Sequence, residues 1–285
     1  MSTGDWVTGW AAKNAPQIGF AFVRADADRW EAGPWPGLQS MKLDLAALSD
    51  GLFSARRIRV KPDATAPDTG WYRHDGDFDF IYVLSGSVAI ETEAGEHCTL
   101  GPGASGLYPA LTLRRDYSAS PDLEYIRVTI PSALPVIVAR ESDLPASTSQ
   151  LDPGRQPVYT FDLPETYVVG AGPRSLFEYR DLGTASATAG RIHIYVVHAV
   201  EGAAGIGWHC HPMARWFLIL EGSADVAVED KPIFHMRPLD SMCAGRGIRH
   251  DVVRFSSDCK LIEMCVPADY EIPLTDSGRP SRRRS

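Results

Sequence analysis

The chain has 285 residues, which is enough for two ordinary domains or one large one. Its residues are 44% hydrophobic and 22% charged, as in folded globular proteins, and a formal net charge of −8 argues against a general nucleic-acid binder. No apolar segment reaches the roughly 18 residues that cross a bilayer, so we expect no membrane partner.

The amino-terminal segment 1–37 carries four tryptophans and lacks the charged start and apolar block of a signal peptide. The five cysteines are odd in number and scattered, without a CxxC pair, which suits a reducing compartment. We therefore expect a cytoplasmic protein. We also expect the segment to act as an arm that covers an exposed sheet edge, either of its own barrel or of a partner's, and so predict a homodimer.

An internal repeat dominates the rest of the chain. "GWYRHDGDFDFIYVLSGSVAIE", which starts at Gly70, parallels "GWHCHPMARWFLILEGSADVAVE", which starts 137 residues later at Gly207. Downstream, "SPDLEYIRVTIP" (120–131) parallels "SSDCKLIEMCVP" (256–267). Similarity at nearly the same offset, 137 residues at the first landmark and 136 at the second, indicates a tandem duplication.

Both copies consist of short runs rich in Val, Ile, Tyr, Phe and Thr, separated by Gly, Pro, Asp and Ser. This pattern predicts successive β-strands and hairpins, packed as a sandwich or barrel. "LDLAALSDGL" (43–52) is the one candidate for a short helical turn. Residues 133–173, which contain "PASTSQLDPGRQP", are the expected connector, and 271–285 the expected disordered tail.

Two histidines in the second copy share a strand face, because His209 and His211 are two residues apart. Regular alternation would place Arg215 on that same inward face. His250, at the end of "GRGIRH", would arrive from a distant strand and complete three converging imidazoles. Such a trio suits a first-row divalent metal with open coordination positions. The alternative is that these are ordinary core or surface histidines.

These residues carry a resemblance to the cupin superfamily. Gly207, His209, His211 and Gly222 fit the first cupin motif, and "GRGIRH" fits the second, although Gly245 replaces its usual proline. The resemblance covers residues 38–132 and 174–270. It implies a bicupin, all-β, with two tandem cupin (small jelly-roll) barrels, of which the second binds metal.

The glutamate that normally supplies the fourth cupin ligand is missing, because its position falls on Arg215 or Trp216. Neither side chain offers a lone pair to a metal. The second barrel thus resembles cysteine dioxygenase and β-diketone dioxygenase, in which histidines alone hold iron. The resemblance implies one divalent transition metal per chain on His209, His211 and His250, with Fe(II) favoured and Mn, Ni, Cu or Zn as alternatives.

Arg215 has two interpretations. As a catalytic residue it would anchor a substrate carboxylate or enolate, with Trp216 and Phe217 also binding substrate. In the other interpretation it pairs with an acidic side chain, Asp240 or Glu263.

The first barrel departs further from the cupin pattern, since the matching positions hold Tyr72, His74, Asp79 and Arg114. An arginine in the place of a histidine repels a divalent metal. We expect a degenerate, metal-free site in which Arg114 pairs with Asp79. The alternative is a barrel that retains a small-molecule pocket.

These observations predict a non-haem Fe(II) dioxygenase that acts on a small carboxylate-bearing, enolisable or aromatic substrate. One alternative is a non-redox metal-dependent isomerase, lyase or hydrolase. The other is a non-enzymatic ligand-binding or sensor bicupin.

Overall fold

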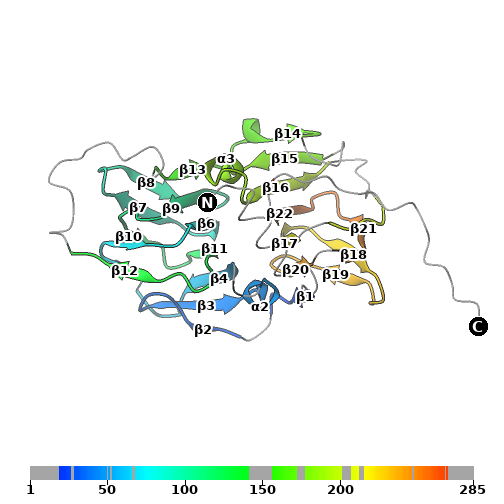
Figure 1. Cartoon of the computed structure of the whole chain (residues 1–285), viewed down its shortest axis with the longest axis horizontal. Coiled ribbons are helices and arrows are strands. Elements are labelled where there is room, and N and C mark those ends of the chain that lie inside the picture. The colour runs from blue at the N-terminus through cyan, green and yellow to red at the C-terminus, as the bar shows by residue number, and fades with distance from the viewer. Residues whose placement is uncertain are drawn as a thin grey trace, which may run out of the picture. The chain divides into compact units, whose positions relative to one another are not determined.

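The computed structural model describes residues 19–26, 29–49, 51, 53–65, 68–140, 156–171, 177–200, 207–211, 215–245, 247–266 and 268. The expected tail 271–285 lies outside these residues. The chain forms two compact units: 28–163, and 1–27 together with 164–285. Strands make up nearly all of the regular structure (Figure 1), which confirms the all-β prediction.

The first unit is built from two antiparallel sheets. Its seven-stranded sheet has the order β13-β9-β6-β11-β4-β3-β2 and its five-stranded sheet the order β12-β5-β10-β7-β8. The strands are β2 (Glu31–Ala32), β3 (Leu38–Lys42), β4 (Ser54–Val60), β5 (Tyr72–His74), β6 (Phe78–Ser85), β7 (Val88–Thr92), β8 (His97–Leu100), β9 (Ser105–Pro109), β10 (Arg114–Ala119), β11 (Glu124–Ile130), β12 (Val136–Val138) and β13 (Val158–Thr160).

The second unit repeats this plan. Its seven-stranded sheet has the order β1-β20-β17-β22-β16-β15-β14 and its three-stranded sheet the order β19-β18-β21. The strands are β1 (Phe20–Val23), β14 (Val168–Val169), β15 (Phe177–Asp181), β16 (His193–Ala199), β17 (Arg215–Glu221), β18 (Ala224–Val228), β19 (Phe234–Met236), β20 (Ser241–Ala244), β21 (His250–Phe255) and β22 (Lys260–Cys265).

Short helical segments also repeat. The predicted helical turn is present as α2 (Leu45–Leu48), and α3 (Thr184–Ala187) follows the matching strand of the second unit. The sequence pattern did not predict α3, and a 3₁₀ turn, η3 (Pro164–Thr166), precedes β14. Two barrels with the same strand order confirm the predicted tandem jelly-roll architecture.

Each barrel encloses an apolar core between its two sheets. In the first unit the core cluster includes Ile58, Val83 and Ile90, all essentially inaccessible to solvent. In the second it includes Ile219 and Val226, also inaccessible. Alternate residues of each strand point into these cores, as the period-2 pattern predicts.

The amino-terminal arm contributes a strand to the second unit. β1 pairs with β20 from Phe20 opposite Ala244 to Val23 opposite Ser241, and so covers an edge of the larger sheet. The first unit has a counterpart, because β13 covers the matching edge strand β9. The arm therefore covers a sheet edge, as predicted, but its described strand pairs with the second barrel of the chain and not with the first barrel, which follows it in sequence.

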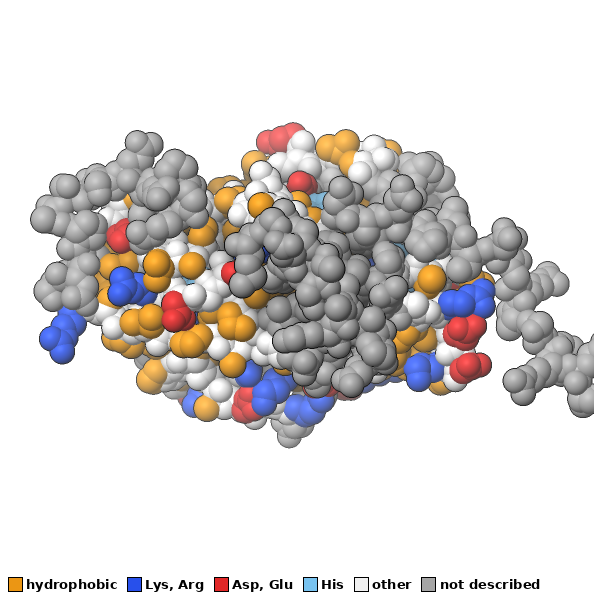
Figure 2. All heavy atoms as spheres, viewed as in Figure 1, with side chains coloured by type: hydrophobic (Ala, Val, Ile, Leu, Met, Phe, Trp, Pro, Cys, Tyr) orange, Lys and Arg blue, Asp and Glu red, His pale blue; other side chains and the backbone are white. Residues whose placement is uncertain are grey.

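On the face shown in Figure 2, basic and acidic side chains of the described residues lie interspersed, with hydrophobic side chains between them. None of the helices among the described residues has the length and apolarity to cross a membrane.

Candidate metal centre

Backbone pairing in the second barrel brings the predicted histidines together. His209 forms an isolated antiparallel bridge with His250, the first residue of β21, and each backbone amide donates to the other's carbonyl. His211 follows two residues later. The ligand atoms of His209, His211 and His250, the histidine triad, lie within 4.8 Å of one another, and all three residues are buried. The ring centroids are 4.5–5.1 Å apart.

Backbone carbonyl groups also fix the orientation of two of these imidazole rings. Nδ1 of His209 lies 2.7 Å from the carbonyl oxygen of Gly207, and Nδ1 of His250 lies 3.0 Å from that of Ile248. Because a carbonyl oxygen only accepts, both Nδ1 atoms carry the proton. The lone pair of each neutral ring is therefore on Nε2, the tautomer that metal-binding histidines adopt when a backbone carbonyl orients them.

Arg215 lies directly beside the third ring. Its Nη1 donates to Nε2 of His211 at 2.9 Å, its Nη2 donates to the hydroxyl of Tyr195 at 2.8 Å, and its Nε pairs with Glu263. A guanidinium cannot accept, so Nε2 of His211 also carries a lone pair. Of the two expectations for Arg215, the acidic partner is present, and that partner is Glu263.

The donor set fits a divalent first-row metal. Three neutral imidazoles with their lone pairs on Nε2, within one apolar barrel, are the ligands such ions take. His209 and His250 carry their lone pairs on Nε2. His211 offers Nε2 once Arg215 withdraws Nη1, so metal and guanidinium compete for one lone pair.

The two residues after Arg215 lie on opposite faces of β17. Phe217 belongs to the apolar core cluster of the barrel. Trp216 is 1% exposed and, by strand alternation, points away from the face that carries Arg215 and Phe217. This placement does not favour contact between Trp216 and a substrate at the histidine triad. Asp240, the other acidic partner considered for Arg215, instead binds Arg24 at 3.0 Å.

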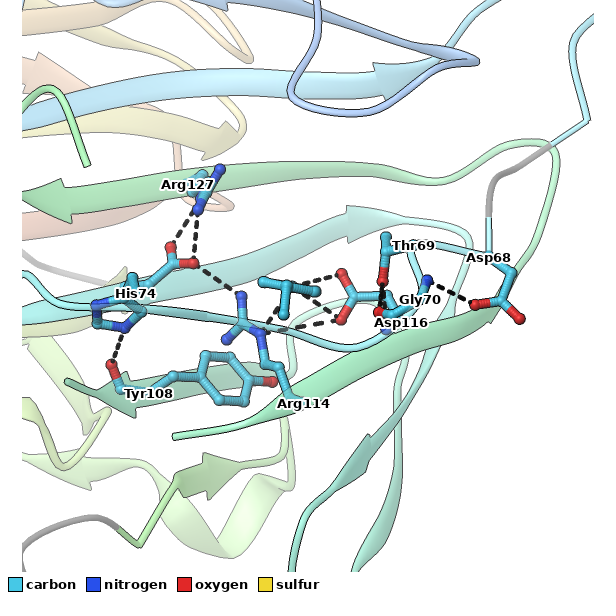
Figure 3. Close-up of polar contacts among 10 residues, drawn as sticks. Asp68, Thr69, Gly70, His74, Tyr108, Arg114, Asp116 and Arg127 are labelled. Atoms are coloured by element: carbon cyan, nitrogen blue, oxygen red, sulfur yellow. Dashed lines mark hydrogen bonds and ion pairs between the residues drawn. The ribbon is translucent and has the colours of Figure 1, made fainter. Parts of the chain in front are cut away.

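The matching site of the first barrel holds an ion-pair network (Figure 3). Arg114 donates from Nη2 to Asp79 at 2.8 Å and from Nε to the hydroxyl of Tyr72 at 2.7 Å. Arg127 binds the same carboxylate through Nε and Nη2, both at 2.8 Å. The predicted Arg114–Asp79 pair is thus present, and Arg127 is a second cation that the sequence pattern did not single out.

Burial and charge act against each other on the carboxyl groups of this network. Burial raises the pKa of Asp79, but the nearby Arg127 and Arg114 outweigh it and hold that pKa below its ordinary value. Desolvation dominates at Asp116, whose pKa is raised although Arg114 and Tyr72 favour the charged form. Asp79 is thus the ionised anchor between two guanidiniums.

Register shows that the two sites occupy corresponding places. Arg114 pairs with Tyr72 in the first barrel as His250 pairs with His209 in the second. Tyrosine and arginine therefore replace two of the three histidines. In the first barrel, Tyr108 also stacks on Arg114, with the guanidinium carbon 3.4 Å from the ring centroid. Through this cation–π contact, the Arg114 side chain is held at the position that corresponds to His250 of the second barrel.

Tyr195 is a further residue at the second site that the sequence pattern alone did not single out. The signal was the period-2 pattern of "RIHIYVVHA", which places Tyr195 on the inner face with Val197. That pattern does not show which strands lie near β17. The contact between Tyr195 and Arg215 could therefore be found only from the strand order of the sheet.

Comparisons with known proteins support the fold. No protein-family model and no curated protein sequence matches the chain. Among solved structures, a mutant of Bacillus subtilis oxalate decarboxylase superposes with a TM-score of 0.60 at 15% identity, covering 88% of this chain and 78% of that one. A putative glyoxylate-induced protein from Pseudomonas aeruginosa gives 0.63 at 12% identity, covering 90% and 92%. A further oxalate decarboxylase structure, from work on its Mn(II) centres, gives 0.58 at 15% identity, covering 86% and 77%.

At these identities the likeness concerns the fold. The strand order, the duplicated barrels and the neighbours together show that this chain has a fold of two tandem jelly-roll barrels, similar to that of these proteins.

Proposed function

We propose that the second barrel binds one divalent transition metal on His209, His211 and His250 and acts on a small carboxylate-bearing, enolisable or aromatic molecule. The observation that carries this proposal is the gathering of three buried histidines whose ligand atoms lie within 4.8 Å of one another. The Nδ1 atoms of His209 and His250 donate to backbone carbonyls, which places the lone pairs of these two rings on Nε2. Fe(II) is the favoured metal, because the ligands are histidines without a carboxylate. The Mn(II) centres of the oxalate decarboxylase neighbour make Mn(II) the first alternative.

When bound, such a metal would supply Lewis acidity and, as Fe(II), one-electron chemistry with O2. The protein's own residues would orient and shield the reaction. The carbonyls of Gly207 and Ile248 hold two rings in place. The apolar residues of the barrel, among them Phe217 and Val226, exclude water from the interior.

Arg215 would bind the substrate's anionic group in this proposal. Its guanidinium is buried and is held by Glu263 and Tyr195, so its position is fixed before substrate arrives. A substrate carboxylate could take the bond that Nη1 now donates to His211, which would release the lone pair of His211 to the metal. Substrate and metal would then favour each other's binding.

Metal content and oxygen consumption test this function. We expect about one metal ion per chain after anaerobic Fe(II) loading, and loss of that metal in His250→Ala. His198→Ala is the matched control, because His198 lies in the same barrel but pairs with Glu178. Unchanged metal content in His250→Ala would refute the site. Turnover of a small organic acid without O2 uptake would show that the protein is a non-redox lyase, isomerase or hydrolase and not a dioxygenase.

A second function is favoured by one observation, the bond between Arg215 and His211. Together with the pair to Glu263, it satisfies Arg215 without any ligand. A metal-free, ligand-binding or sensor barrel would keep this arrangement. A protein that takes up no Fe(II), Mn(II) or Zn(II) under anaerobic loading would establish it.

A further inference from the structure

A polar cavity opens in the first barrel, away from the histidine triad. It has a volume of about 310 Å³, within the lower range of small-molecule sites. Its lining residues come from β3, β4 and β11, from the segment before β3 and from the segment between β11 and β12. It is lined by Ala32, Gly33, Pro34, Ser40, Ser54, Arg56, Ile58, Arg127, Thr129, Ser132, Ala133, Leu134 and Val136. We refer to it as the mouth pocket.

Three cationic side chains stand in one row across the sheet at this pocket. Lys42 of β3 is directly opposite Arg56 of β4, and Arg56 is directly opposite Arg127 of β11. Directly paired residues point to the same face of a sheet, and like charges in such pairs repel. A row of this kind costs free energy unless anions lie beside it.

The protein supplies too few carboxylates for these cations. Glu31 is shared by Lys42, at 3.1 Å, and Arg56, at 2.6 Å. Asp79 is shared by Arg127 and Arg114, each at 2.8 Å.

The three cations of this row thus depend on Glu31 and Asp79, and Asp79 is shared with Arg114 as well. The remaining carboxyl of the network, Asp116, lies 4.0 Å from Arg114 and reaches neither Arg56 nor Arg127. The mouth pocket therefore keeps a surplus of positive charge.

Both arginines that line the pocket have donors to spare. Arg127 uses Nε and Nη2 on Asp79, and its Nη1 has no hydrogen-bond partner among the residues that the structure describes. Arg56 uses Nη1 on Glu31 and Ser40, while its Nε and Nη2 have no partner among those residues. Two hydrogen bonds to Asp79 hold Arg127 in place, so this guanidinium is oriented before a ligand arrives.

Hydroxyl groups complete the lining. Ser54 and Thr129 share a hydrogen bond of 2.8 Å, and the Thr129 hydroxyl lies 3.4 Å from the carbonyl oxygen of Ser132, which also lines the pocket. Hydroxyls donate and accept, so they suit the hydroxyl or keto oxygens of a small polar molecule.

We propose that the mouth pocket of the first barrel binds a small organic acid, whose carboxylate lies between Arg56 and Arg127 and whose hydroxyl or keto oxygens contact the hydroxyls of Ser54, Thr129 and Ser132. The planar guanidinium forks match a carboxylate in two-point contact. This barrel would thus be a second ligand site, separate from the histidine triad and independent of any metal.

Calorimetric titration of the full-length protein tests the site, with malate, citrate and inorganic phosphate as probes at constant ionic strength. We expect at least one of the two organic acids to bind more tightly than phosphate. Arg56→Gln should weaken that binding about 10- to 100-fold, as expected for lost charge-assisted hydrogen bonds. Arg56→Lys should bind with intermediate strength, because it keeps the charge and loses the fork.

Two control variants make the result decisive. Arg59 lies on β4 three residues after Arg56, on the other face, where its guanidinium stacks on Trp30 at 3.9 Å. Arg59→Gln removes the same charge and should leave binding unchanged. His250→Ala should also leave it unchanged, which separates this site from the proposed metal centre.

Three results would overturn the proposal. The first is that neither organic acid binds the wild-type protein. The second is equal loss in Arg59→Gln, which would indicate unspecific charge attraction. The third is loss in His250→Ala with retention in Arg56→Gln, which would place the acid at the second barrel. Circular dichroism and the melting temperature of each variant show that it is folded.

Discussion

Asp79 of β6 and Arg215 of β17 occupy corresponding positions of the two barrels and carry opposite charges. Asp79 pairs with Arg127 of β11, and Arg215 pairs with Glu263 of β22. Register confirms the correspondence, because Asp79 is opposite Thr129 and Arg215 is opposite Cys265, in each case two residues beyond the charged partner. The duplicated chain has kept one buried ion pair and reversed its polarity.

The reversed ion pair is accompanied by a difference between the two barrels at the position of His250. In the first barrel the anion faces a second cation, Arg114, where the second barrel has His250. In the second barrel the cation faces His211, a neutral ring that can accept its hydrogen bond. In each barrel the charged side chain at this position thus has a suitable partner: the Asp79 carboxylate binds the Arg114 cation, and the Arg215 cation donates to the neutral ring of His211.

Loss of the Asp79 charge should destabilise the first unit strongly. Asp79→Asn leaves two buried guanidiniums without their common anion, so we expect the free energy of unfolding to fall by about 3–5 kcal/mol. Urea denaturation measures this. Glu31→Gln is the control, because Glu31 is 44% exposed where it pairs with Arg56, and its pair should be worth about 1 kcal/mol or less. Equal effects of the two substitutions would contradict the buried network.

The lowered pKa of Asp79 predicts how the free energy of unfolding depends on pH. The pKa of Asp79 is lower in the folded protein than its ordinary value of 3.8, so its contribution is complete above that pH and is lost as pH falls through the folded value. We expect the urea midpoint of the wild type to drop more steeply below about pH 4 than that of Asp79→Asn. Parallel pH profiles for the two proteins would show that Asp79 does not carry the dependence.

Arg215 and Glu263 should show strong energetic coupling. Arg215→Met alone leaves a buried carboxylate without a partner and should cost about 3–5 kcal/mol, whereas the double variant Arg215→Met/Glu263→Met should cost much less. The double variant should also bind Mn(II) about tenfold more tightly or better, because no donor then competes for Nε2 of His211. Additive stabilities, or unchanged metal affinity, would count against this arrangement.

Asp240 should determine how firmly β1 is held. Its carboxylate accepts from Nη1 of Arg24 and from the backbone amides of Ala25 and Arg237, at 2.8–3.0 Å. In Asp240→Ala we expect the amides of β1 to exchange hydrogen about 10- to 100-fold faster. Asp225→Ala is the control, since Asp225 pairs with Arg254 in the smaller sheet. Unchanged exchange in β1 would show that strand pairing alone retains the arm.

Much of the site could be predicted from the sequence because its signals are local. The two-residue spacing of His209 and His211 defines a shared face, and counting along the second motif from Gly103 through Pro109 aligns Arg114 with His250. The expected pair between Arg114 and Asp79 followed from that alignment and is confirmed.

Other features depend on which strands become neighbours. Glu263 and Asp240 were both open as partners of Arg215, and only the order β20-β17-β22 with its register selects Glu263. The row of Lys42, Arg56 and Arg127 likewise appears only when β3, β4 and β11 lie side by side.

The duplication, the all-β class and the three members of the histidine triad could therefore be read from the sequence alone. The tertiary structure decided the partner of each buried charge, the edge that the arm covers and the cation row of the mouth pocket. The physical reason is that side-chain alternation is a property of one strand, whereas ion pairs and pockets between strands depend on long-range register.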